Sequence, residues 1–185
     1  LQMPSEEIPV SDHKRIQLAL EVLGYEHVIM PLSVLQTIYP MCRHANFDIT
    51  LTLVSRETDW VVVDVEPGDK RSSHYGLAVD FGSTTIVMHL IDMNSGAVID
   101  QVKAVNGQTK YGTDILSRIT FALEDASHVE ELQQATVRTF HSLMAELMEN
   151  TGIAVTKCPI MMISGNTTMI HFLLKLDAWT VFASP

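Results

Sequence analysis

The chain has 185 residues, of which 46% are hydrophobic and 18% charged, and its formal net charge is −10. This composition is typical of a folded globular protein. The acidic balance, without a basic tract, argues against nucleic acid or an anionic membrane surface as a partner. No apolar run approaches the roughly 18 to 20 residues needed to span a bilayer. Because the sequence begins at Leu1 rather than at a methionine, we expect it to come from a longer protein.

The first residues, 1–10, contain two prolines and no periodicity, and they are interpreted as a linker. Residues 11–24 then predict a helix that begins at Ser11 or Asp12 and ends at Gly24. A second, shorter helix is expected within residues 31–46, interrupted at Pro40. The apolar face of the first helix is expected to consist of Ile16, Leu20 and Leu23.

A β-hairpin is expected next, because residues 47–55 and 59–67 are rich in β-branched residues and flank a polar turn. Together with the two helices it forms a small α+β domain. The polar, turn-rich stretch at 68–74 is interpreted as its boundary, so that this domain covers residues 11–74.

The pattern starts again after this boundary and indicates an α/β domain over residues 75–185. We expect a three-stranded antiparallel meander, two helices, a short apolar strand at the centre of the sheet, and a last helix. The strands are expected at 75–82, 84–92, 97–105 and 158–166, and the helices at 113–126, 128–152 and 167–177.

An unusual run of polar residues, "DFGSTT", joins the first two strands of this domain. Glycine and hydroxyl residues are common in hairpin turns, so an ordinary turn is one interpretation. A glycine at a tight turn also lets backbone N–H groups approach an anion, and a neighbouring carboxylate can hold Mg²⁺. Asp80 beside Gly82, Ser83, Thr84 and Thr85 therefore suits a metal-bound polyphosphate better than a simple anion.

Two other stretches combine helix caps with chemistry. In "ISGNTT" an apolar strand ends before Gly165, and Asn166 and Thr167 begin a helix, whose free N–H groups attract phosphate. In "YGTDILSR", Asp114 either caps the following helix or orders a catalytic water. The eight histidines have no metal-ligand spacing, and the two cysteines, Cys42 and Cys158, lie too far apart to build a cysteine-based cluster, which fits a reduced, cytoplasmic setting.

The order of the predicted elements resembles the ribonuclease-H-like first lobe of an actin-like ATPase. It consists of two strands joined by "DFGSTT", a third strand, helices, a strand and a last helix. This is the ASKHA superfamily of actin, heat-shock chaperones and sugar kinases. The stretches "GLAVDFGSTTIVMHLID", "YGTDILSRITFALED" and "ISGNTTMIHFLLKLD" are most similar to one branch of it, the reductive activators of corrinoid proteins, which include the activating enzymes of O-demethylase systems. The likeness covers residues 75–185, and the preceding small domain resembles that branch's middle domain.

The resemblance implies a protein that uses ATP and Mg²⁺ to restore cob(I)alamin on a corrinoid protein of a methyltransferase system. In that family a [2Fe–2S] cluster lies in an N-terminal domain that these residues lack. The phosphates would bind at Gly82, Ser83, Thr84 and Thr85, with Gly165, Asn166 and Thr167 at the cleft floor. Asp80 would hold Mg²⁺, and Asp114 would position water. The resemblance is also compatible with a homodimer.

Two alternatives remain. The chain could be one lobe of a small-molecule kinase of the same superfamily, although no convincing catalytic base for such a substrate is present. It could also be a non-catalytic interaction module that binds a partner through residues 11–67. No G-K-[ST] loop or G-x-G-x-x-G motif points to another nucleotide fold.

Overall fold

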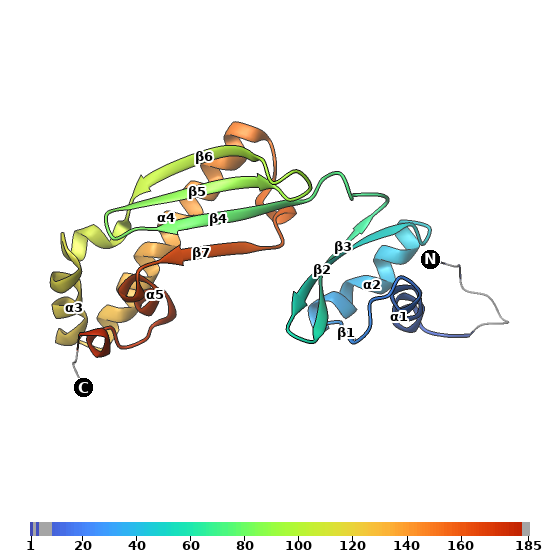
Figure 1. The fold of residues 1–185 in the computed structure, drawn as a ribbon, viewed down its shortest axis with the longest axis horizontal. Coiled ribbons are helices and arrows are strands. Elements are labelled where there is room, and N and C mark those ends of the chain that lie inside the picture. The colour runs from blue at the N-terminus through green and yellow to red at the C-terminus, as the bar shows by residue number, and fades with distance from the viewer. Residues whose placement is uncertain (2, 4–8, 183–185) are drawn as a thin grey trace. The chain divides into compact units, whose positions relative to one another are not determined.

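The structure, a computed structural model, describes residues 1, 3 and 9–182, which leaves most of the predicted linker outside the described residues. The chain divides into two compact units, Leu1–His74 and Tyr75–Pro185 (Figure 1). Each unit has its own hydrophobic core. Within the described part of the chain, no helix has the length and apolar character that crossing a membrane would require.

The first unit packs two helices against a three-stranded sheet. The strand order is β1-β3-β2, with β1 parallel to β3 and β2 antiparallel to it. The predicted hairpin is confirmed as β2 and β3, whereas the short strand β1 was not predicted. The elements are α1 (Asp12–Val22), β1 (Val28–Ile29), α2 (Leu32–His44), β2 (Ile49–Arg56) and β3 (Asp59–Pro67).

Both helices of this unit differ in detail from the prediction. Ser11 caps α1 as expected, but Leu23 lies beyond the helix end and is 71% exposed, so it is not part of the apolar face. The second helix is longer than the first and continues through Pro40. A proline inside a helix costs about 3 kcal/mol. Burial of Ile38 and Cys42 on either side of Pro40 offsets this cost.

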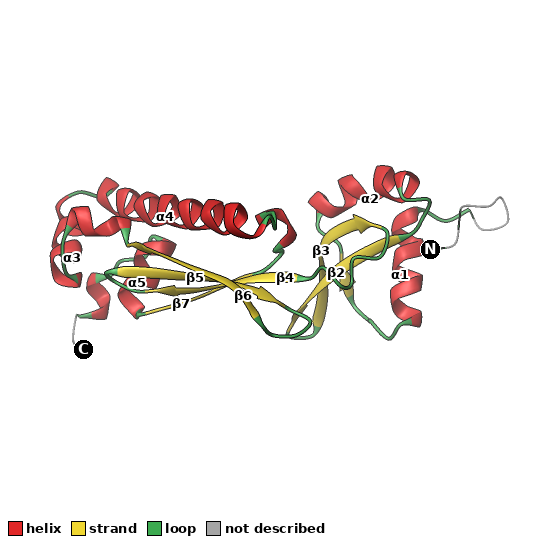
Figure 2. Ribbon diagram, turned by 90° about the horizontal axis from the view of Figure 1, so that it is seen from above, coloured by secondary structure: helices red, strands yellow, loops and turns green. Residues whose placement is uncertain are grey.

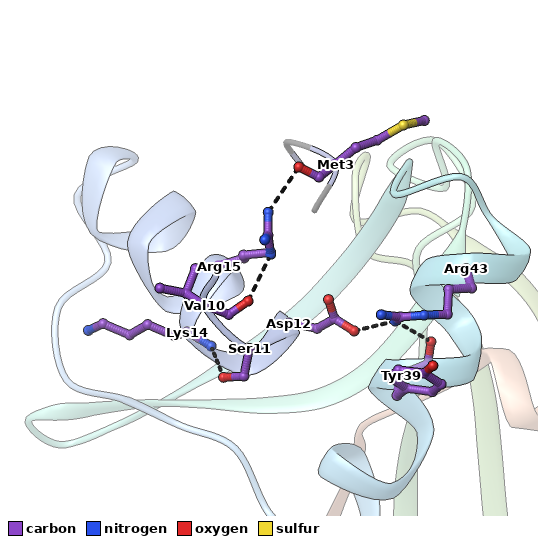
Figure 3. A network of polar contacts seen from close by, with 8 residues as sticks. All are labelled: Met3, Val10, Ser11, Asp12, Lys14, Arg15, Tyr39 and Arg43. Atoms are coloured by element: carbon purple, nitrogen blue, oxygen red, sulfur yellow. Dashed lines mark hydrogen bonds and ion pairs between the residues drawn. The ribbon is translucent and has the colours of Figure 1, made fainter. Parts of the chain in front are cut away.

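Polar contacts fasten the start of α1 to its surroundings (Figure 3). The buried Arg15 donates from Nε to the carbonyl of Val10 at 3.1 Å and from Nη1 to the carbonyl of Met3 at 3.0 Å. Arg43 of α2 forms an ion pair with Asp12 and lies 3.5 Å from the centre of the Tyr39 ring. The Asp12–Arg43 ion pair joins α1 to α2, whereas Arg15 binds the stretch of chain that precedes α1.

The second unit is a four-stranded sheet with the order β6-β5-β4-β7. Strands β4, β5 and β6 form the predicted antiparallel meander, and β7 is parallel to β4. The long helix α4 runs along one face of this sheet (Figure 2). The elements are β4 (Tyr75–Phe81), β5 (Thr85–Asp92), β6 (Val98–Val105), η1 (Gly107–Tyr111), α3 (Ile115–Glu124), α4 (Ser127–Thr151), η2 (Val155–Lys157), β7 (Met161–Gly165), α5 (Thr167–Leu174) and η3 (Trp179–Val181).

Strand β7 does not lie where its apolar sequence predicted. We expected it at the centre of the sheet, but among the described residues it is an edge strand that pairs with β4 alone. Met161 and Ile163 pack against the core, whereas Met162 is 65% exposed on the other face. An apolar sequence indicates burial, and here only one face of the strand is covered.

Alternating apolar residues build the core of this unit. Ile86, Met88 and Leu90 of β5 face α4 and are buried, as are Phe140 and Leu143 of that helix. Because side chains alternate along a strand, the intervening residues of each strand lie on the opposite face. This alternation decides on which face of the sheet the motif residues lie.

Candidate functional site

Asp80 lies near the end of β4, on the face of the sheet opposite α4. Its neighbours Val79 and Phe81 are 3% and 0% exposed in the core, so the alternation of the strand turns Asp80 away from the core. Its side chain is exposed. A carboxylate in this position is accessible to a hydrated metal ion.

The turn after β4 depends on Gly82. A Cβ atom at this position would lie 2.4 Å from the carbonyl oxygen of Thr85, closer than any real side chain approaches. Ser83 is half-buried, and Thr84 and Thr85 are exposed. The tight turn therefore places the hydroxyl residues that follow Gly82 close to Asp80 in the chain.

The second predicted motif lies beside the first. In the register of the parallel pair, Ser164 is the partner of Asp80 and Gly165 is the partner of Phe81. Asn166 then caps α5, and its Oδ1 accepts a hydrogen bond from the backbone N–H of Met169 at 3.0 Å. Because β4 and β7 run in the same direction, the hairpin and the start of α5 lie at the same end of the sheet (Figure 1).

Asp114 is the N-cap of α3. Its Oδ1 accepts a hydrogen bond from the backbone N–H of Ser117 at 2.8 Å, and the Ser117 side chain completes a capping box. This backbone hydrogen bond is the main reason why the pKa of Asp114 is lowered. Helix α3 packs on α4 and on η1. Asp114 therefore caps α3, and its hydrogen bonds are to Ser117.

Sequence reasoning missed a buried polar network behind the hairpin. Asn106, directly after β6, donates from Nδ2 to the carbonyl of Gly82 at 2.9 Å and from its backbone N–H to the carbonyl of Thr84 at 2.8 Å. Its Oδ1 accepts from the backbone N–H of Gln108 at 2.9 Å. "VNGQ" looks like a turn, and no local signal indicates that Asn106 contacts a loop 24 residues earlier in the chain.

Arg118 of α3 continues this network. It is 0% exposed, and burial lowers the pKa of its guanidinium group. Its Nε donates to the carbonyl of Gly112 at 2.8 Å, and its Nη1 lies 3.5 Å from Oε1 of Gln108 and 3.6 Å from Sδ of Met169. The network thus connects α3 and η1 with the start of α5.

The site combines a tight turn rich in hydroxyl residues with one adjacent carboxylate. Within residues 1, 3 and 9–182, no group of three or more His, Cys, Asp or Glu side chains could hold a metal ion by itself. Mg²⁺ commonly keeps several waters and uses one or two carboxylates together with substrate phosphates. Asp80 fits that mode of binding, because it is a single accessible carboxylate beside a turn of hydroxyl residues.

Comparisons with known proteins agree with this architecture. The family model described as RACo middle region matches residues 75–185, and the one described as RACo linker region matches residues 1–72. The corrinoid activation enzyme RamQ of Eubacterium limosum is 29% identical over 117 residues, which cover 63% of this chain and 20% of RamQ. A solved structure, a reductive activator for corrinoid, iron-sulfur protein, superposes with a TM-score of 0.80 at 27% identity, over 96% of this chain and 28% of that protein.

The fold is that of a small α+β domain followed by the first, actin-like lobe of an ASKHA-type protein, as predicted. The chain belongs to the RACo family. In that family's own terms, the first unit is the linker region and the second unit is the middle region. The chain spans 20% of the curated relative and 28% of the solved one.

Proposed function

We propose that this chain supplies the phosphate-binding lobe of an ATP-dependent reductive activator, which restores cob(I)alamin on a corrinoid protein of a methyltransferase system. The observation that carries the proposal is the pairing of Asp80 and Phe81 with Ser164 and Gly165. This pairing brings the hairpin and the start of α5 together, in a chain of the RACo family.

In the proposed site, Asp80 holds Mg²⁺ through water. The backbone amides and hydroxyls of the hairpin, Gly82, Ser83, Thr84 and Thr85, bind the β- and γ-phosphates of ATP. Gly165, Asn166 and Thr167 form the floor beside them. Gly82 makes the tight turn of this hairpin possible, because a Cβ there would collide with the carbonyl oxygen of Thr85.

Bound Mg-ATP would supply negative charge that favours one arrangement of the protein over another. A ligand shifts a conformational equilibrium only by its difference in affinity for the two states. Electron transfer itself needs a donor, which we assign to a [2Fe–2S] cluster in a domain outside these residues. Cys42 and Cys158 lie in different units of this chain, and such a cluster needs four ligands.

The proposed reaction adds one electron from the reduced cluster to cob(II)alamin and gives cob(I)alamin, while ATP binds and is hydrolysed at the lobe. The partner would be a corrinoid protein, in the cytoplasm, and neither nucleic acid nor a membrane takes part. A homodimer is compatible with this role.

The proposal is tested with the protein encoded by the full reading frame that contains these residues. The protein is reduced, mixed with a corrinoid protein in the cob(II)alamin state, and the absorbance of cob(I)alamin is followed with and without Mg-ATP. We expect cob(I)alamin to form only when Mg-ATP is present. ATP consumption that depends on a small-molecule phosphoryl acceptor would favour the kinase alternative, and a protein that never binds nucleotide would favour an interaction module.

A further inference from the structure

Asn106 is in direct contact with the proposed phosphate-binding turn, although it is far from that turn in sequence. The residue is 0% exposed at the end of β6. Two of its N–H donors, Nδ2 and the backbone N–H, reach the carbonyls of Gly82 and Thr84. The carbonyl of Gly82 is thereby directed toward the buried Asn106 side chain, and the carbonyl of Thr84 toward the Asn106 backbone N–H.

The direction of these carbonyls fixes the direction of the neighbouring amides. In a trans peptide group the C=O and the following N–H point to opposite sides, and no peptide bond of the described residues is cis. The N–H groups of Ser83 and Thr85 therefore point away from Asn106. With the carbonyls of Gly82 and Thr84 occupied, the turn can offer the amides that follow them to an anion.

We infer that Asn106 is the positioning residue of the phosphate-binding turn: it binds the two turn carbonyls and so aims the turn amides at the polyphosphate of the nucleotide. This inference rests on the proposed nucleotide site. It adds a residue that neither phosphate motif contains, and one that acts through Gly82 and Thr84 without touching the ligand itself.

The surrounding network holds the Asn106 amide in the required orientation. Gln108 donates its backbone N–H to Oδ1 of Asn106, which leaves Nδ2 to face Gly82. The Gln108 side chain is itself bound to α4, through Nε2 to the carbonyl of Leu132 at 3.2 Å and to Oγ1 of Thr136 at 2.8 Å. Nδ2 of Asn106 also lies 3.8 Å from Sδ of Met169, in the first turn of α5.

The test compares Asn106→Ala with Asn106→Asp and with a matched control, Thr139→Val, in the full-reading-frame protein. Asn106→Asp keeps the shape and the Oδ1 acceptor but cannot donate to Gly82. Thr139 accepts from the backbone N–H of Gly107 at 3.2 Å, so its valine variant loses a neighbouring buried hydrogen bond and leaves the turn untouched. Dissociation constants are measured for Mg-ATP and for adenosine.

Both Asn106 variants are expected to bind Mg-ATP about tenfold more weakly, as the loss of one to two hydrogen bonds predicts, while adenosine binding stays unchanged. Thr139→Val is expected to bind both ligands as the wild type does. In the ¹⁵N-labelled 185-residue chain without nucleotide, the amide resonance of Ser83, which follows the Gly82 carbonyl, should shift in both Asn106 variants and stay unchanged in Thr139→Val.

The outcomes separate the inference from the proposed function. A wild-type protein that does not bind Mg-ATP overturns the proposed function, and the inference with it. A wild type that binds Mg-ATP, with Asn106→Asp binding it equally well, overturns the inference alone. Equal weakening of Mg-ATP and adenosine binding also overturns it, because a general loss of structure does not depend on the phosphates.

Discussion

Gly165 lies against the backbone of Phe81 in the neighbouring parallel strand, and a Cβ at Gly165 would be 2.9 Å from the carbonyl oxygen of Phe81. Gly165→Ala should therefore push β7 away from β4 and lower the free energy of unfolding by about 1–3 kcal/mol, the usual cost of overpacking. Urea unfolding of the 185-residue chain measures this change. Ser164→Ala is the control in the same strand. A Gly165→Ala chain as stable as this control would show that the strands separate without cost.

Asp80 is the residue whose loss should remove activity and leave the fold intact. In the full-reading-frame protein, Asp80→Asn keeps the shape of the side chain but removes the charge that would hold Mg²⁺. We expect Mg²⁺-dependent ATP turnover to fall by on the order of 2 kcal/mol or more in transition-state stabilisation. Glu124→Gln, at another exposed carboxylate, is the control for net charge. Unchanged turnover together with a lower melting temperature would mean that Asp80 is structural.

Asp114 allows capping to be separated from catalysis, because asparagine is as good an N-cap as aspartate. Asp114→Asn should keep the stability at neutral pH, whereas Asp114→Ala should lose about 0.5–2 kcal/mol. If ATP turnover falls in the asparagine variant as well as in the alanine variant, the carboxylate positions water. If turnover is unchanged in the asparagine variant, Asp114 is a cap and nothing more.

The acid side of the stability curve gives an independent test of the same cap. The folded-state pKa of Asp114 is lowered, so its ionised form stabilises the fold above the ordinary pKa of aspartate, about 4. This contribution is lost as the pH falls through the folded-state pKa. Asp114→Asn should therefore lose less stability than the wild type over this acidic range, as measured by thermal unfolding at a series of pH values. Identical pH profiles would contradict the capping interaction.

The strands of the second unit could be predicted because their signals are local. Ile86, Met88 and Leu90 alternate with less buried residues, and this alternation both defines β5 and decides which face packs on α4. The polar residues at Asp80 and after it interrupted the apolar pattern at the point where the chain turns. The two motifs were found by composition, and their adjacency follows from the parallel pairing of β4 and β7.

What the sequence could not reveal depends on tertiary contacts. Pro40 is tolerated inside α2 because Ile38 and Cys42 of the same helix pack into the core, and no local rule contains that information. The apolar composition of β7 did not distinguish a central strand from an edge strand with one covered face. The sequence singled out no role for Asn106, because its contact with Gly82 exists only through the pairing of β5 and β6.

The last prediction concerns nucleotide binding by these 185 residues alone. In an ATPase of two lobes the nucleotide lies between them, so each lobe supplies only some of the contacts. The hairpin and the start of α5 offer amides and hydroxyls to the phosphates, but they lie in water, where exposed charges are screened. Binding must also overcome several kcal/mol of lost translational and rotational freedom. We therefore expect a dissociation constant for Mg-ATP of about a millimolar or weaker, roughly −4 kcal/mol.

Calorimetry on this chain and on the full-reading-frame protein compares the two dissociation constants for Mg-ATP, and much tighter binding is expected for the full-reading-frame protein. A low-micromolar, adenine-specific site on the 185 residues would mean that residues 75–185 hold a whole nucleotide site.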